Sequence, residues 1–477
     1  MIRTKKKIVD FTEGPLLGKM LAMFFPLFCN NLLQSFYHAA DVMVVGLSSD
    51  PDAVGAVGLI SPVSSLFVNL FIGIAIGADV LVGRLLGAKE EDKLSAAIHT
   101  SVLFSIILGG ALSVFGVVFS KPLLILMGAQ GHLLDLAVTY ARIYFAGKIF
   151  LAIQNYAAAV LRAMGDTRTT LYANSVCGVI NVLLNLFFVL VCDMTVEGVA
   201  LATTVSTACS AAWLLARLMH AEGSCRLYLR KLRIHRESLR QILYVGVPSG
   251  VQMAIFSFCN IFVTSSILKV NNMMAVEGAL FQPVVKGNTA VSTYDGFVYT
   301  GMSAMTSTVI SVASQNVGAK NYQRVKRVTL TGIFLSSAVG LMLSLLMYLL
   351  RDPLLGFYSI SAAGAGTLEQ LAYDTAVCRM HLLSLPYFMC GIMNVLAGVA
   401  KTVGKALTST VISLLGAGAL RLTILLVIFP LILRLEVVYL SFPVTWIVTA
   451  AAQGVCVALT LRHLDRRQKA QQNEKTV

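Results

Sequence analysis

Charged side chains are scarce in this chain. They make up 13% of its 477 residues, against 57% apolar residues, whereas a soluble domain carries about 25% charged residues. Residues 198–216 and 241–268 contain no Lys, Arg, Asp or Glu, and a helix of about 20 apolar residues crosses a bilayer core. The composition excludes a soluble fold for most of the chain and predicts an all-α polytopic membrane protein.

The signatures of several enzyme and pump classes are also missing. No GK[ST] phosphate loop occurs, so ATP-driven transport by this chain is excluded. No HExxH or GxSxG motif indicates a hydrolase. The nine cysteines include no CxxC pair and lie mostly in apolar runs, which favours small buried side chains over disulfides or a metal site. We therefore expect no enzymatic activity and no cofactor, with energy supplied by an ion gradient or a partner.

Cations outnumber acids by 14, but their positions argue against nucleic-acid binding. Alternate connectors between the apolar runs hold 28 of the 37 Lys and Arg residues. This asymmetry follows the positive-inside rule and predicts an even number of spans with both termini cytoplasmic. The start of the chain is basic but has no small-residue cleavage site, so no removable signal peptide is expected. We expect a multi-pass protein of the cell membrane.

Apolar runs between charged or Gly/Pro-rich breaks predict twelve spans. The run at 280–315 is the most polar of them. The predicted spans are 16–46, 54–82, 94–119, 136–160, 169–191, 196–219, 241–268, 280–315, 328–350, 372–399, 406–432 and 437–461.

Two motifs occur once in each half of the chain. Gly-Ala-Lys follows the second span at 87–89 and again after the eighth at 318–320, and a basic-x-x-Gly pattern follows the fourth and tenth spans. Gly87 and Gly318 are expected to have a structural role, ending a helix in a tight turn with Lys near anionic headgroups. Both copies fall on the same side of the membrane, so the repeats are parallel, and such transporters hold substrate between two halves that rock. The predicted parts are an N-terminal lobe (1–220), a linker (221–240), a C-terminal lobe (241–462) and a tail (463–477).

Polar residues of the first span share one helix face. Asn30, Gln34, Tyr37 and Asp41 recur at steps of four, three and four. A carboxyl group at membrane depth is costly when charged and often marks an ion path. Asp41 is therefore a candidate proton carrier, or a Na⁺ ligand together with Asn and Tyr oxygens. The alternative is that Asp41 lies near the outer end of the span and meets headgroup water.

The fifth and sixth spans carry further polar faces. Asn174, Asn181 and Asn185 lie at i, i+7 and i+11, which fits either interhelical hydrogen bonds or an ion site. Thr203 begins a hydroxyl face on the sixth span, where interhelical hydrogen bonding is the simpler interpretation.

Two ionisable residues of the second half, Asp295 and Arg421, fall inside predicted spans. Asp295 fits either a second titrating group or a residue in a re-entrant or water-exposed break. Arg421 needs an acidic or carbonyl partner, and a structural lock between helices explains it better than substrate contact. Candidate polar residues of a cavity, from both halves, are Gln34, Tyr37, Asn174, Gln252, Asn260, Asp295, Tyr299, Tyr387 and Asn394.

Five motifs follow one another in a fixed order: Gln34-Ser-Phe-Tyr37-x3-Asp41-x4-Gly46, Gly83-Arg84-x2-Gly87-Ala88, Leu161-Arg162-Ala-Met-Gly165-Asp166-Thr167-Arg168, Asn181-x3-Asn185 and Glu197-Gly198-Val-Ala200-Leu-Ala202-Thr203. By the order and spacing of these motifs, the chain resembles the MATE (multidrug and toxic compound extrusion) transporters over nearly its full length. The resemblance implies two six-helix lobes related by a pseudo-twofold axis and export of organic cations coupled to Na⁺ or H⁺.

In the prokaryotic branch with an acidic first span, the carboxylate that matches Asp41 is the proposed cation site. The resemblance thus implies coupling at Asp41, with Asn181, Asn185 and Thr203 as neighbours. Asn185 stands where some members have a second acid, and the seventh and tenth spans lack the acids of other branches. H⁺ and Na⁺ both stay open as the coupling ion.

The favoured function is export of lipophilic organic cations, in exchange for H⁺ or Na⁺, by a transporter that works in the bilayer as a monomer. An acidic, aromatic cavity favours organic cations on electrostatic grounds. The alternative is a flippase for a lipid-linked saccharide, which would need more spans and several cavity cations for phosphate groups.

Overall fold

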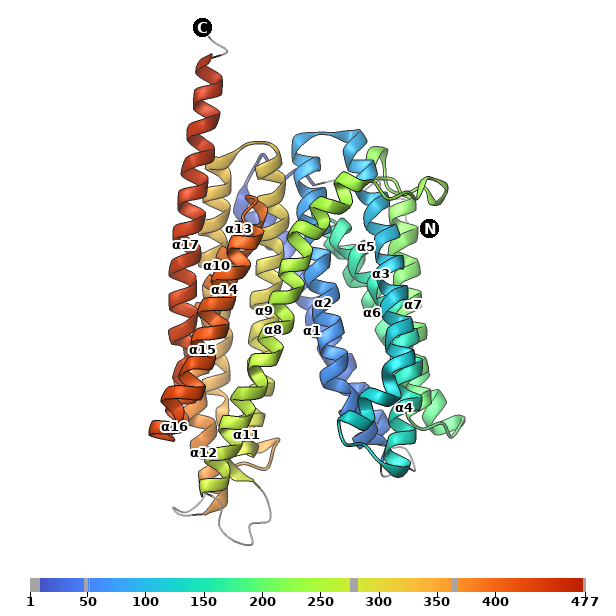
Figure 1. Ribbon diagram of the computed structural model, residues 1–477, viewed down its shortest axis with the longest axis vertical. Helices are drawn as coiled ribbons and strands as arrows, with labels where there is room; N and C mark the ends of the chain where they lie inside the picture. The colour runs from blue at the N-terminus through green and yellow to red at the C-terminus, as the bar shows by residue number, and fades with distance from the viewer. Residues whose placement is uncertain (1–8, 47–49, 51, 275–281, 363–366, 475–477) are drawn as a thin grey trace. The chain divides into compact units, whose positions relative to one another are not determined.

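The computed structural model describes residues 9–46, 50, 52–274, 282–362 and 367–474 (Figure 1). The described residues are mostly helical and include no strand, which confirms the all-α fold class. Ten of their helices are long and apolar enough to cross a membrane, and a bent helix pair raises the number to eleven. The remaining predicted span, 280–315, is a continuous helix made more polar by Lys286, Asp295 and many hydroxyl side chains. The connectors around 48–52 and 269–277 lie partly outside the described residues.

The helices of the first half match the predicted spans to within several residues. In order they are α1 (Leu16–Val45), α2 (Ala53–Ala88), α3 (Glu91–Leu126), α4 (Gly131–Ala146), α5 (Lys148–Ala163), α6 (Thr167–Leu186), which continues as a π-helical turn (Phe187–Val191), and α7 (Val196–Met219).

The second half begins with three long helices, and several later ones are interrupted. In order they are α8 (Arg236–Met274), α9 (Pro283–Gly318), α10 (Tyr322–Leu349), α11 (Arg351–Gly356), α12 (Leu368–Arg379), α13 (Phe388–Thr402), α14 (Ala406–Ser413), α15 (Leu420–Thr423), α16 (Phe429–Ile432) and α17 (Leu435–Glu474).

The interruptions in two predicted spans coincide with a glycine and a proline. The run at 136–160 is the pair α4 and α5, which meet at Gly147 with a bend of 40°. A Cβ at Gly147 would lie 2.6 Å from the hydroxyl of Thr204, so the absent side chain lets the bend approach α7. The run at 372–399 passes through a π turn and a 3₁₀ turn around Pro386, because proline has no N–H to continue the helix.

The chain packs as two compact units. The first comprises Met1–Gly250 together with Ser314–Ala319, and the second comprises Val251–Ala313 with Lys320–Val477. The linker proposed at 221–240 lies wholly in the first unit. These packing units therefore divide within α8 and near the end of α9, and the predicted lobe boundaries stay a prediction.

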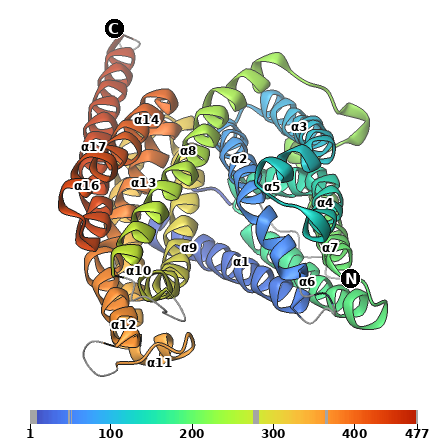
Figure 2. The same ribbon diagram turned by 60° about the horizontal axis from the view of Figure 1, so that its bottom comes forward.

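Within the first unit, α2 and the start of α8 approach each other through glycines (Figures 1 and 2). Gly73 and Gly77 on α2 face Gly246 and Gly250 on α8, so each helix presents a Gly-x-x-x-Gly pair to the other. A Cβ on Gly77 would overlap the carbonyl oxygen of Ile242. Small residues at this spacing let helix backbones pack closely where lipid gives no hydrophobic drive.

The glycines of the two Gly-Ala-Lys motifs also make close backbone contacts inside the first unit. A Cβ on Gly87 would overlap the carbonyl oxygen of Gln315, and one on Gly318 would overlap that of Arg84. α9 ends at Gly318 and α2 ends at Ala88, one residue after Gly87, while Lys89 and Lys320 take the left-handed conformation beyond each helix, each with φ of 57°. The glycines allow the last turns of α2 and α9 to touch.

Gly77→Ala should destabilise the protein, because the added methyl group meets backbone atoms that cannot move aside. We expect the free energy of unfolding to fall by about 1–3 kcal/mol, measured by thermal unfolding in detergent. Gly18→Ala on α1 is the matched control, since no atom lies within 4 Å of the added carbon. Equal unfolding of both variants would contradict close α2–α8 packing.

Candidate functional site

The carboxylate of Asp41 on α1 is bound by side chains from α6 and α7. Asn185 Nδ2 donates to Asp41 Oδ1 at 2.5 Å, and Thr203 Oγ1 lies 3.4 Å from Asp41 Oδ2. Asp41 is partly buried and Asn185 fully buried. Three helices of the first unit therefore bring together the residues that the sequence singled out.

Asn181 makes two further hydrogen bonds to the partners of Asp41. Asn181 Nδ2 donates to Thr203 Oγ1 at 3.4 Å, and Asn185 Nδ2 also reaches Asn181 Oδ1 at 3.4 Å. Asn185 Oδ1 is buried and has no hydrogen-bond donor within the described part of the chain. Amide, carboxylate and hydroxyl oxygens are the ligand types that hard cations prefer. The donor set fits Na⁺, and the carboxylate equally fits a proton.

The close approach of α1 and α6 depends on a glycine. A Cβ on Gly178 would overlap the ring of Tyr37. The Tyr37 hydroxyl donates to the carbonyl oxygen of Ser175 at 3.2 Å. Tyr37 thus packs α1 against α6 one turn before Asp41, whereas Gln34 on the same helix is exposed.

Asn174 belongs to a separate polar cluster in the first unit. Its Nδ2 donates to Asn30 Oδ1 at 2.7 Å, and its Oδ1 accepts from Ser210 Oγ at 2.6 Å and from Gln154 Nε2 at 2.8 Å. Sequence reasoning missed Gln154. Its signal was the pair of adjacent amides, Gln154 and Asn155, inside an otherwise apolar run.

In the second unit, Asp295 is part of a buried ion pair. Arg379 Nη2 lies 2.8 Å from Asp295 Oδ2 with both side chains less than a tenth exposed, and Ser384 Oγ donates to Asp295 Oδ1 at 2.6 Å. Arg379 Nη1 also donates to Asn288 Oδ1 at 2.7 Å. Asp295 therefore lies in a continuous helix with a fixed counter-ion, and the re-entrant or water-exposed break proposed for it is wrong. Arg379, a cation near the start of the tenth run, was overlooked.

Arg421 has other partners than the predicted acid or carbonyl. Its Nη2 donates to Thr445 Oγ1 at 3.0 Å, and its guanidinium lies 4.0 Å from the centre of the Phe442 ring. A hydroxyl and an aromatic face from α17 hold it. These contacts join the eleventh run to α17.

The other predicted cavity residues of the second unit do not assemble into one site. Asn260 and Tyr299 are exposed, Gln252 is buried, Tyr387 stacks on Trp446 and Asn394 contacts Cys390. None of them lines the groove of about 620 Å³ between α8 and α9. That groove is lined by Thr264, Ile267, Leu268, Val285, Asn288, Thr289, Ser292 and Thr293.

Lys148 is a buried cation that the sequence analysis passed over. It begins α5, directly after the bend, and is 2% exposed. Its Nζ lies 3.6 Å from the centre of the Tyr144 ring and 3.5 Å from Ser64 Oγ. The aromatic face and hydroxyl hold the ammonium group inside the first unit.

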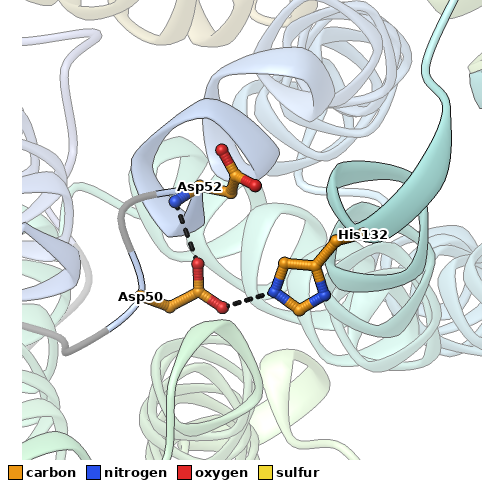
Figure 3. Close-up of side chains that lie close together, drawn as sticks. All are labelled: Asp50, Asp52 and His132. Carbon is orange, nitrogen blue, oxygen red and sulfur yellow. Dashed lines mark hydrogen bonds and ion pairs between the residues drawn. The ribbon is translucent and has the colours of Figure 1, made fainter.

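Asp50, Asp52 and His132 form an exposed cluster at the ends of α2 and α4 (Figure 3). His132 Nε2 lies 2.7 Å from Asp50 Oδ2, and this hydrogen bond holds the pKa of Asp50 below its usual value. Asp52 precedes the first residue of α2, and His132 lies in the first turn of α4. The N-terminal end of a helix carries a partial positive charge, which favours anions and repels cations. The cluster is therefore better suited to holding the connector after α1 against α4 than to binding a metal ion.

The chain is similar in sequence to known proteins. A model of the MatE family matches residues 26–187 and 248–427. The chain is 28% identical over 417 residues to the probable multidrug resistance protein YoeA of Bacillus subtilis, covering 84% of each chain. It is 22% identical to the multidrug export protein MepA of Staphylococcus aureus, covering 53% of this chain and 56% of MepA.

Solved structures share the fold. A crystal structure of MATE in complex with MaL6 superposes with a TM-score of 0.87 at 20% identity, covering 97% of this chain and all of the other. An outward-facing multidrug resistance MATE family transporter gives a TM-score of 0.83 at 19% identity, covering 98% of this chain.

Arg379→Met should destabilise the second unit, because it leaves the Asp295 carboxylate buried without its counter-ion. We expect a loss of about 3–5 kcal/mol in the free energy of unfolding, measured by thermal unfolding in detergent. The double variant Asp295→Leu/Arg379→Met removes both charges and should recover most of that loss. Wild-type stability of Arg379→Met would show that the pair is not a lock.

Proposed function

The chain belongs to the MatE family, and we propose that it exports lipophilic organic cations in exchange for H⁺ or Na⁺ bound at Asp41. The observation that carries this proposal is the cradle around Asp41, in which Asn185 and Thr203 face the carboxylate from two other helices. A carboxyl group in such a site changes its net charge when it gains or loses a small cation.

The cradle supplies the chemistry that an exchanger needs. Asn185 donates to Asp41 at 2.5 Å, which stabilises the ionised carboxylate without neutralising it. A proton or Na⁺ can neutralise the charge, with Asn185 Oδ1 and Thr203 Oγ1 available to a metal ion. Loss of that cation leaves a negative charge that attracts a cationic substrate. Linkage between the two binding events would then drive one cation out as the other enters.

The remaining steps are inferred from the family. We propose that the site opens to one side of the membrane at a time, as in other carriers built from repeats. The excess of Lys and Arg in alternate connectors supports the proposal that both termini are cytoplasmic. We further propose a cell-membrane location and a monomer.

The names of the related proteins favour export of drugs over flipping of a lipid-linked saccharide. YoeA and MepA are both named for multidrug resistance or export. A flippase would need free cations to receive phosphate groups, whereas Arg379, Arg421 and Lys148 are each held by neighbouring protein groups. We therefore infer organic cations as the substrate class.

Asp41→Asn should abolish gradient-driven transport, because an amide cannot gain or lose the coupling cation. Proteoliposomes would be given a proton gradient or a Na⁺ gradient, and uptake of a fluorescent lipophilic cation would be followed. Asp50→Asn is the control, since this carboxylate is bound by His132 outside the cradle. Transport by Asp41→Asn at the wild-type rate would show that Asp41 is not the coupling residue. In the wild-type protein, the gradient that drives uptake, H⁺ or Na⁺, identifies the coupling ion.

Asn185→Ala should tighten binding of a coupling proton at Asp41 without preventing transport, because the hydrogen bond from Asn185 stabilises the empty, ionised carboxylate. Losing one hydrogen bond to a charged group costs about 1.5–3 kcal/mol, so if the coupling ion is H⁺, the half-maximal rate should be reached at an H⁺ concentration about tenfold lower or less. Asn174→Ala on the same helix is the matched control, because Asn174 bonds to Asn30, Gln154 and Ser210. An equal shift in both variants would argue against a specific role for Asn185.

A further inference from the structure

Residues 9–13 precede α1 and lie against the ends of other helices of the first unit; we call them the strap. Phe11 is 2% exposed. Its N–H donates to Gln315 Oε1 at 3.0 Å, and its carbonyl oxygen accepts from Asn316 Nδ2 at 3.2 Å. The N–H of Val9 donates to the carbonyl oxygen of Met164, just after α5, at 3.2 Å. The strap is thus bound to the ends of α5 and α9.

Gln315 joins three segments at once. Besides accepting from Phe11, its Nε2 donates to the carbonyl oxygen of Ala163 at 2.8 Å and to that of Val9 at 3.4 Å. Gln315 is 3% exposed. The Gln315 amide uses its donors and its acceptor in these bonds. Breaking them would cost free energy, because buried donors and acceptors would be left without hydrogen-bond partners.

These contacts act on the part of α9 that packs apart from the rest of the helix. Ser314–Ala319 belongs to the first unit, whereas the preceding residues of α9 belong to the second. In the same turn, Gly318 lies against the backbone of Arg84 at the end of α2. The strap therefore binds the one turn of α9 that is packed with the first unit.

We propose that the strap is a lock on the last turn of α9, with Phe11 and Gln315 as its positioning residues. The inference rests on the proposed transport function, because a carrier must open and close each end of its substrate path. Opening at the end where α2 and α9 stop requires the last turn of α9 to leave the first unit. That movement breaks the Gln315 bonds and exposes the Phe11 ring.

Hydrogen–deuterium exchange measures the lock directly. Phe11→Ala and Gln315→Met should each raise exchange of backbone amides 315–320 by about tenfold or more, because local opening sets the rate of exchange. Gln315→Met keeps the side-chain length, so packing stays similar while the hydrogen bonds are lost. Thermal unfolding of each variant verifies that the rest of the protein stays folded.

Two conservative variants serve as controls. Thr12→Ala removes only the local bond from the Thr12 hydroxyl to Asp10, and Phe11→Leu keeps an apolar side chain in the buried position. Both should show wild-type exchange at 315–320. Exchange that stays unchanged in Phe11→Ala and Gln315→Met would overturn the lock.

Transport separates a lock from a permanent tie. If the strap is released in each cycle, Phe11→Ala and Gln315→Met should alter the turnover rate while Phe11→Leu does not. Faster exchange with unaltered turnover would show a structural tie and overturn the proposal. Failure of Asp41→Asn to affect transport would instead refute the proposed coupling, and the exchange result would still decide whether the strap holds α9.

Discussion

A charged group inside a membrane protein must find its partners within the protein, because hydrocarbon offers none. This constraint explains the arrangement around Asp41. The carboxylate is not left to lipid; it meets Asn185 from α6 and Thr203 from α7. Those partners are neutral, so the negative charge is solvated and yet not cancelled. The site proposed for cation exchange is therefore one whose charge no fixed cation cancels.

The same constraint has the opposite result in the second unit. Asp295 is paired with Arg379 and also accepts from Ser384. The fixed guanidinium occupies the position that a mobile cation would take, and the pair is neutral as a whole. One acid is thus suited to exchange and the other to holding helices together. The kind of neighbour, not the carboxylate itself, makes the difference.

Packing of the helices that carry these groups depends on small residues. Gly178 admits the Tyr37 ring between α1 and α6, and the Gly73 and Gly77 pair admits the backbone of α8. Where lipid gives little drive for helices to associate, close backbone approach provides the contact. The polar cradle and the glycine contacts are therefore linked, since Asp41 reaches α6 only because α1 lies so near.

The sequence by itself determined the membrane class, the helical runs and the polar face that ends at Asp41, because hydropathy and helical periodicity are local properties. The grouping of Asn181, Asn185 and Thr203 with Asp41 came only from the resemblance to a transporter family. Only the tertiary structure showed that Arg379 neutralises Asp295, that Gln154 joins Asn174, and that the span after residue 130 bends at Gly147. Those facts depend on which residue of a distant helix faces each side chain. Spacing along one helix does not contain that information, since pairing between helices is decided by packing in three dimensions.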